Sequence, residues 1–381
     1  MSLANAQLAA LHETAGSLDP LLAYLRTIDY SLGAIAALVG EKDPTNFVRN
    51  AGFSALSYDP VLKASPTPLA CLARLFLFGG SVSESAYAVI PRDMQDLLDR
   101  FGLVRRSDGT ITSEVTIGEL ESQYFVSDKL FDLAADGLKL NTASDAVWPL
   151  SEWSLALHEQ LDFEDSWTSL LDVGGGSGCL AILAGDRYAQ RVAIDLNPRA
   201  TAFSQLNAQL ARASSLRCET ADCLTFADRA IEKFDHVVFA APGGPSGPTT
   251  GESAMVAHGG AFGHELVIKF LSAQIDNLLA PGGCCHIWGV FAVEERLGSI
   301  RRLVEEALPG DRFDVSIEPV RSGGLYLSRE HIQSRKVPRG SHYAQGDGVS
   351  SVLEWLNERG VIEVASAVVA IRHREEGLLG F

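Results

Sequence analysis

Residues 169–184 read SLLDVGGGSGCLAILA, and residues 191–195 read RVAID. A short apolar run precedes four glycines, and helix-forming residues follow from Leu180 to Ala184. This order predicts a buried strand, a sharp turn, a helix and a second strand. Because glycine lacks a Cβ atom, such a turn can adopt positive φ and bring its backbone against a ligand. The stretch therefore predicts a nucleotide-binding unit.

The glycine spacing narrows the kind of nucleotide. A dinucleotide site is typical of G-x-G-x-x-G, but the sixth position here is Cys179. Asp195 ends the second strand, where a carboxylate can accept hydrogen bonds from both ribose hydroxyls of an adenosine. Pro198 then occupies a favoured first-turn position of the next helix. The pattern favours an adenosine ligand other than NAD.

The glycine turn resembles the D-x-G-x-G-x-G motif of the class I S-adenosylmethionine-dependent methyltransferases. The matching residues are Asp172, Gly174, Gly176 and Gly178. Within that class, residues 195–200 and Asn207 resemble the subgroup that methylates release-factor glutamines or rRNA guanines. The resemblance extends roughly from Val126 to the C-terminus, and more loosely over the residues before it.

The resemblance implies a Rossmann-like α/β fold whose sheet has seven strands, the last one antiparallel. It also implies that S-adenosyl-L-methionine is the cofactor, with Asp222 placed to bind the adenine amine. The residues expected to hold the cofactor are Asp172, Gly174, Gly175, Gly176, Asp195, Leu196, Asn197, Asp222, Cys223 and Ala240.

Composition restricts the partners. The net charge of -17 opposes nucleic-acid binding, because phosphate contacts require a basic face. The six cysteines form no C-x-x-C pair and no zinc-type spacing with histidine, so we expect reduced thiols and no metal site. No apolar run reaches ~18 residues, so no membrane span is expected, and the protein is predicted to be cytoplasmic.

The chain exceeds the usual size of one domain, and we expect two: residues 1–125 and residues 126–381. From Leu3 to Val39, apolar residues recur at helical spacing. These helices form either an internal core, which is the commoner outcome, or the interface of a homodimer. Both alternatives stay open.

Helices at residues 68–78 and 91–101, followed by a hairpin at 103–112 through Asp108-Gly109, predict a winged-helix-like module. Such a module binds DNA, covers a substrate or mediates dimerisation. The second helix carries three aspartates that phosphates would repel, so the cover or dimer role is preferred. These are Asp93, Asp96 and Asp99.

The second domain continues with alternating strands and helices. Residues 234–240 are almost continuously apolar, as a parallel strand buried on both faces should be. A turn at 280–283 is expected before a strand at 284–290, and residues 361–372 predict the last strand. Residues 241–260 form a long loop of the kind that is usually functional. Residues 326–348 are predicted to be an inserted surface loop.

The resembled subgroup has Asn-Pro-Pro-Tyr/Phe after the fourth strand, where the asparagine grips a planar amide. Here the matching residues are Ala240-Ala241-Pro242-Gly243. Alanine offers no partner for an N–H group, which indicates a changed acceptor. We therefore expect methyl transfer to a small molecule such as a natural-product intermediate. A protein glutamine or rRNA base remains an alternative, as does a cyclase or structural protein that only binds the cofactor.

A hydroxyl acceptor would require a base, and histidine has a suitable pKa. His258 and His264 lie at the end of the long loop, and His286 lies on the fifth strand; His258 is the first choice. Trp148 and Trp153 precede the first strand. Each of them either contacts substrate or belongs to the core. The candidate substrate residues are Trp148, Pro242, Glu252 and Trp288.

Overall fold

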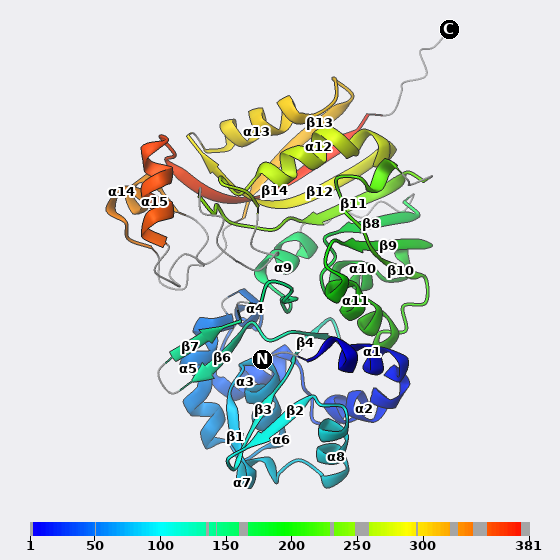
Figure 1. The fold of residues 1–381 in the computed structure, drawn as a ribbon, viewed down its shortest axis with the longest axis vertical. Coiled ribbons are helices and arrows are strands. Elements are labelled where there is room, and N and C mark those ends of the chain that lie inside the picture. The colour runs from blue at the N-terminus through cyan, green and yellow to red at the C-terminus, as the bar shows by residue number, and fades with distance from the viewer. Residues whose placement is uncertain are drawn as a thin grey trace. The chain divides into compact units, whose positions relative to one another are not determined.

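The computed structural model describes residues 3–374 apart from 50, 135–136, 142, 160–166, 229–231, 248–258, 295, 321–326 and 338–348 (Figure 1). The chain forms two compact units. Unit 1 comprises residues 1–152, 176–183 and 198–214, and unit 2 comprises residues 153–175, 184–197 and 215–381. The predicted domain boundary at residue 125 stays a prediction.

Unit 2 contains a seven-stranded sheet in the order β10-β9-β8-β11-β12-β14-β13. Its strands are β8 (Ser169–Val173), β9 (Gln190–Asp195), β10 (Leu216–Thr220), β11 (Phe234–Ala240), β12 (Leu279–Val293), β13 (Phe313–Pro319) and β14 (Glu363–His373). Neighbours pair in parallel from β10 to β12, and β14 is antiparallel to both β12 and β13. This is the sheet of the class I methyltransferase fold, and the predicted fold class is confirmed.

One face of the sheet packs against α12 (Glu265–Leu278) and α13 (Arg296–Ala307), as Figure 1 shows. Alternate residues of β11, Val237 and Phe239, are buried on this face with Phe270 and Ile275 of α12. Burial of this kind stabilises by about 1.5–3 kcal/mol for each large apolar side chain. The intervening residues of β11 and β12 line the opposite face, which faces α9 (Glu152–Glu159).

Two predictions for unit 2 need correction. The turn expected at 280–283 is a bulge inside β12, because Leu279 already pairs with Phe234 before Cys284 pairs with His236. The surface loop expected at 326–348 contains α14 (Arg329–Ser334), and Leu327 forms a bridge to Val364. Leu327 and Ile332 are fully buried there, so apolar contact holds this segment. The helix that follows is α15 (Val349–Glu358).

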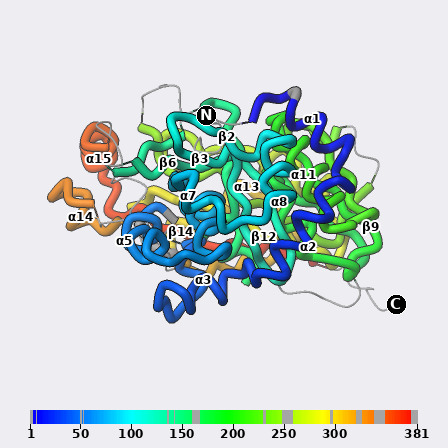
Figure 2. The backbone as a smooth tube through the Cα atoms, turned by 90° about the horizontal axis from the view of Figure 1, so that it is seen from below, coloured from blue at the N-terminus to red at the C-terminus, as the bar shows by residue number. Residues whose placement is uncertain are grey.

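Unit 1 begins with α1 (Asn5–Glu13), η1 (Ala15–Leu18), α2 (Asp19–Thr27) and α3 (Leu32–Val39). Figure 2 labels the three α-helices. The leucines at helical spacing are buried within this unit. They are Leu8, Leu11, Leu18, Leu21, Leu22 and Leu25. α1 packs on α11 (Pro198–Leu210), and α2 packs on α8 (Arg92–Arg100). The predicted homodimer is untested, and these leucines are not available to form its interface.

The rest of unit 1 is mixed. Its further elements are α4 (Asn46–Arg49), α5 (Ala51–Ala64), α6 (Pro68–Leu72), a π-helical turn η2 (Ala73–Leu77), α7 (Glu84–Tyr87) and α10 (Cys179–Leu183). β1 (Ser81–Ser83), β3 (Thr110–Ser113) and β2 (Val104–Ser107) form one sheet in that order. The pairs β4 (Thr116–Leu120) with β5 (Gln123–Ser127) and β6 (Phe131–Ala134) with β7 (Gly137–Leu140) form two more. Ser107 pairs with Thr110, which confirms the predicted hairpin.

Two buried polar contacts anchor α11 within unit 1. The Asn207 side chain accepts a hydrogen bond from the Val126 amide (2.8 Å) and donates to the Val126 and Ser177 carbonyls (2.9 Å each). Arg199 forms a two-pronged ion pair with Asp128, at 2.7 Å from Nε and 2.5 Å from Nη2. Val126 lies on β5, Asp128 follows it, and Ser177 lies just before α10, so these contacts tie α11 to two segments that are distant in sequence.

No single helix among the described residues is long and apolar enough to cross a membrane; one bent pair, residues 15–27 and 32–39, passes that test by length and composition.

The buried ion pair predicts a large loss of stability when one partner is removed. Asp128→Ala leaves the Arg199 guanidinium buried without its counter-charge and should lower the free energy of unfolding by about 3–5 kcal/mol. As a control, Glu305→Ala breaks the exposed pair with Arg301 and should cost about 0.5 kcal/mol or less. Urea denaturation measures both, and equal costs would contradict the anchoring role of Asp128.

Candidate active site

The strand order places the candidate site. The chain runs outward from β8 in one direction through β9 and β10, and in the other through β11 and β12. In open parallel sheets, ligands bind beyond the carboxyl ends of the strands where this order reverses. A ligand is therefore expected to contact the residues that directly follow β8, β9, β10 and β11.

The turn after β8 requires glycine. Gly174, Gly176 and Gly178 have φ of 65°, 55° and 78°, values that other residues adopt only with strain. The Gly175 amide donates to the Ile194 carbonyl (3.0 Å), and a Cβ at Gly175 would lie 3.1 Å from the Ala193 Cβ. The turn is thus held against β9, with Gly174 exposed and Gly175 and Gly176 half-buried. Asp172 is buried just before it.

The end of β9 presents a carboxylate and an exposed apolar side chain. Asp195 Oδ1 accepts a hydrogen bond from the Asn197 amide (2.8 Å), which fixes the orientation of the carboxylate. Leu196 is 55% exposed, although most large apolar side chains of the chain are buried. Asn197 is buried beside them. An exposed leucine next to an oriented carboxylate fits the base and the sugar of a nucleoside.

The end of β10 repeats this arrangement. The Ala221 amide donates to the Asp195 carbonyl (2.9 Å), so Asp222 follows directly beside Asp195. Asp222 Oδ1 accepts from the Leu224 amide (2.8 Å). Burial, and next the Asp222 charge, raise the pKa of Cys223 to about 12. Cys223 is therefore a neutral thiol at this position and not a nucleophile.

Directly after β11 the chain packs against Trp288, which stacks on a second tryptophan. Ala240 pairs with Trp288 of β12, and the Ala241 amide donates to the Trp288 carbonyl (3.0 Å). The Trp288 ring is fully buried and stacks on Trp153 of α9, with centroids 5.1 Å apart. A Cβ at Gly243 would lie 3.1 Å from this ring. Trp288 thus lies under the connection that contains the half-buried Pro242, and its Nε1 has no hydrogen-bond partner among the described residues.

The two ends of the long connection after β11 lie side by side. The Ser246 and Gly247 amides donate to the carbonyls of Gly260 and Ala261 (3.1 Å each). A Cβ at Gly259 would lie 2.7 Å from the Pro242 carbonyl oxygen, so the packing there admits only glycine. The predicted residues Glu252 and His258 lie between these two segments in the sequence and outside the described residues.

His264 directly precedes α12 and lies at the base of this connection. Its ring stacks between Phe262 (6.0 Å) and Phe291 (5.9 Å), and it is 9% exposed. Burial outweighs the neighbouring Glu265 carboxylate and lowers the pKa of His264 below its usual 6.5. The imidazole is therefore neutral at pH 7, and its Nδ1 has no partner in the described part of the chain. A neutral imidazole is the form that a general base requires.

His286 lies in a different environment. Its Nδ1 is 2.8 Å from His236 Nε2, and His236 Nδ1 is 2.6 Å from the Tyr188 hydroxyl. A consistent assignment has Tyr188 donating to His236, and His236 donating to His286. His286 pairs with Val238, which is level with Asp172, but its Nδ1 is bonded to His236, and His236 pairs with Leu170 near the amino end of β8, away from the glycine turn. This position does not favour His286 as a base.

Sequence inspection identified neither His236 nor Tyr188. Each is a single polar residue in or beside an apolar strand, and no motif signals it. Trp148, a predicted substrate residue, lies in unit 1 and is half-buried. The described residues contain no group of three or more His, Cys, Asp or Glu that could hold a metal ion. Of the six cysteines, none forms a disulfide and four are buried.

The His236 cluster predicts a pH-dependent stability. Burial, and then the His286 and Arg372 neighbours, lower the pKa of His236 well below 6.5. As the pH falls below 6.5, the unfolded chain therefore binds a proton that the folded chain does not. The free energy of unfolding then decreases by up to about 1.4 kcal/mol for each pH unit. His236→Gln should show a shallower fall between pH 7 and 5 in urea titrations. Identical slopes would exclude His236 as the cause.

No family model and no curated protein matches the sequence. The [4+2]-cyclase SpnF is 16% identical over 58% of this chain and 80% of its own, with a TM-score of 0.36. A ribosomal protein L11 methylase from Lactobacillus delbrueckii subsp. bulgaricus is 15% identical over 58% and 77%, with a TM-score of 0.34. The M. jannaschii tRNA m1G37 methyltransferase is 13% identical over 77% and 67%, with a TM-score of 0.38. Such values carry no argument about activity, so the fold rests on the strand order.

Proposed function

We propose that this chain is an S-adenosyl-L-methionine-dependent methyltransferase acting on a small-molecule acceptor. One observation carries the proposal: the glycine turn after β8, the oriented Asp195 carboxylate and the exposed Leu196 lie at the carboxyl edge where the strand order reverses. This edge combines a glycine backbone that a ligand can approach closely, a carboxylate that can accept hydrogen bonds from ribose hydroxyls, and an apolar surface for the adenine ring.

The residues at this edge fit the cofactor. Asp195 would accept the ribose hydroxyls, Leu196 would cover one face of the adenine, and Asp222 would accept its amine. Asp222 Oδ1 is used by the Leu224 amide, and the described residues provide no partner for its Oδ2. When bound, the cofactor supplies a methyl group on a sulfonium, and the protein then has only to position the acceptor, exclude water and accept a proton.

The acceptor side supports a small molecule. Ala240 has no polar side chain to grip a planar amide, and the next amide, that of Ala241, is already bonded to Trp288. A protein glutamine or an rRNA base would lose the contact that the resembled subgroup gives it. These macromolecular acceptors, and a cofactor-binding cyclase or structural role, are the alternatives that an acceptor screen with labelled cofactor separates.

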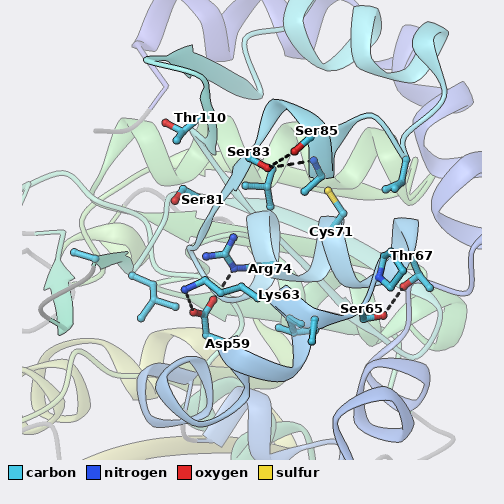
Figure 3. A pocket seen from close by; sticks show the side chains of 18 of the residues that line it. Asp59, Lys63, Ser65, Thr67, Cys71, Arg74, Ser81, Ser83, Ser85 and Thr110 are labelled. Carbon is cyan, nitrogen blue, oxygen red and sulfur yellow. Dashed lines mark hydrogen bonds and ion pairs between the residues drawn. The ribbon is translucent and has the colours of Figure 1, made fainter.

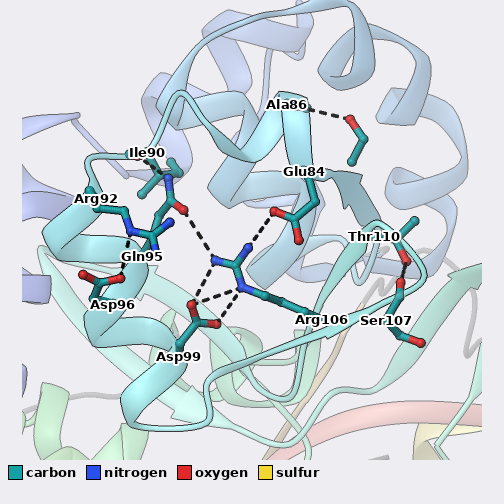
Figure 4. A network of polar contacts seen from close by, with 11 residues as sticks. Glu84, Ala86, Ile90, Arg92, Gln95, Asp96, Asp99, Arg106, Ser107 and Thr110 are labelled. Carbon is teal, nitrogen blue, oxygen red and sulfur yellow. Dashed lines mark hydrogen bonds and ion pairs between the residues drawn. The ribbon is translucent and has the colours of Figure 1, made fainter.

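The order of elements from α6 through β1, α7, α8, β2 and β3 supports the winged-helix interpretation of this part of unit 1. Two of its arginines, Arg92 and Arg106, are paired with carboxylates, as Figure 4 shows. Arg106 donates to Glu84 (2.6 Å), Asp99 (2.9 Å) and Gln95 (3.4 Å). Arg92 pairs with Asp96 at 3.1 Å. The module therefore favours a substrate-covering or dimerising role over DNA binding.

We expect Asp195→Ala to weaken S-adenosylmethionine binding at least about tenfold, because it removes charge-assisted hydrogen bonds to the ribose. Leu196→Ala should weaken it about fivefold and leave folding stability unchanged, since this side chain is exposed. Glu318→Ala, an exposed carboxylate on β13, is the control. Calorimetry with equal affinities for all three variants would refute the cofactor assignment.

A fluorescence-anisotropy titration with duplex DNA should show no salt-sensitive binding. The net charge is -17, and the arginines of the winged-helix-like module that the structure shows paired would have to leave their carboxylates before they could contact phosphates. Tight binding that weakens steeply with salt would overturn this expectation.

The proton acceptor is tested once labelled cofactor has identified a methyl acceptor. His264→Phe keeps the stacked ring but removes its nitrogens, and it should lower kcat by about 10²–10⁴ if His264 is the base. His258→Ala is the matched test of the other candidate. Cofactor affinity should stay within about twofold in both variants, because a base acts on the acceptor. Unchanged kcat in a variant removes that histidine from the mechanism.

A further inference from the structure

A pocket of about 690 Å³ lies entirely within unit 1, away from every residue assigned above (Figure 3). Its wall comes from α5, the segment 65–67, η2, β1 and α7, with the β6–β7 hairpin at one side. Apolar side chains form much of the lining. They include Leu56, Leu62, Val82, Val89 and Leu133.

Three charged residues line this pocket, and they form one connected group. Asp59 accepts from Arg74 Nε and from Lys63 Nζ, each at 2.6 Å. Burial alone would raise the pKa of Asp59, but the hydrogen bonds from Lys63 and Arg74 outweigh it and lower that pKa. The group consequently carries one net positive charge.

Arg74 presents the unused part of its guanidinium to the pocket. Arg74 is 8% exposed, and the described residues provide no partner for its two terminal nitrogens. Figure 3 shows these nitrogens pointing away from Asp59, toward the side of Ser81. A buried guanidinium fork without acceptors favours a planar, two-oxygen ligand such as a carboxylate.

The backbone holds this side chain in place. Arg74 belongs to a π-helical turn, a feature frequent at functional sites. The Gly80 amide donates to the Arg74 carbonyl (2.8 Å), and a Cβ at Gly80 would lie 2.9 Å from Arg74 Cγ. Only glycine at position 80 leaves the arginine stem undisturbed. The Arg74 fork is therefore preorganised.

We propose that this pocket binds a small organic monocarboxylate with an apolar body, whose carboxylate takes both terminal nitrogens of Arg74. The single net positive charge of the group matches one carboxylate, whereas a phosphate dianion would leave one negative charge uncompensated. The apolar wall accommodates the body of the ligand. Burial raises the pKa of Cys71 to about 12, so its thiol stays neutral and adds to that wall. This inference does not depend on methyl transfer.

Titration calorimetry with octanoate, octanol and inorganic phosphate tests the proposal on the full chain. Octanoate should bind one site. Arg74→Lys keeps the charge beside Asp59 but loses the fork, and should weaken octanoate at least about tenfold with little effect on octanol. Ala86→Trp fills the exposed rim and should weaken octanoate similarly, whereas Ala88→Trp, exposed but outside the lining, should not.

Several results would overturn the proposal. One is the absence of octanoate binding to the wild-type chain, and another is equal binding by the two tryptophan variants. Octanol binding as tight as octanoate would mean an apolar pocket without anion recognition. Competition by phosphate at similar concentrations would assign the fork to phosphate. Thermal midpoints of all variants, compared with wild type, separate loss of binding from loss of folding.

Discussion

The hydrogen bond from the Gly175 amide to the Ile194 carbonyl is the contact on which the candidate site depends. It draws the turn after β8 so close to β9 that a Cβ at residue 175 would crowd Ala193. The same register brings the end of β9 beside the end of β10, where the Ala221 amide meets the Asp195 carbonyl. Three chain segments therefore reach one edge with their geometry set by backbone contacts. Side chains at that edge need only to recognise a ligand.

Features that depend on local patterns could be predicted from the sequence. The glycine turn, the apolar strand at 234–240 and the hairpin at Asp108-Gly109 each combine a short-range signal with a well-defined backbone geometry. The strand order followed from the resemblance that these patterns carry. The positions of Asp195 and Leu196 at the strand end followed from the same alternation.

Features that depend on tertiary contacts could not be predicted from the sequence. The stacking of Trp153 on Trp288 joins residues more than a hundred positions apart, and nothing in either local sequence indicates it. In the sequence, Arg74 and Asp59 cannot be told from ordinary surface charges. Only the packing of α5 against η2 brings them together. Leu327 and Ile332 are isolated apolar residues in a polar segment, so no periodicity predicted the contacts that hold α14.

Two paired segments, residues 246–247 and residues 260–261, close the connection after β11 at its base. Ser246 and Gly247 bond to Gly260 and Ala261 through backbone amides and carbonyls, so these two contacts do not depend on which side chains these four positions carry. The entropy of closing a loop changes only slowly with its length. A change in the number of residues between 247 and 259 therefore alters the entropy of closing this connection only slightly. The ends of β9 and β10 are held by their own backbone contact, from the Ala221 amide to the Asp195 carbonyl, and a change in the length of that connection does not alter this contact.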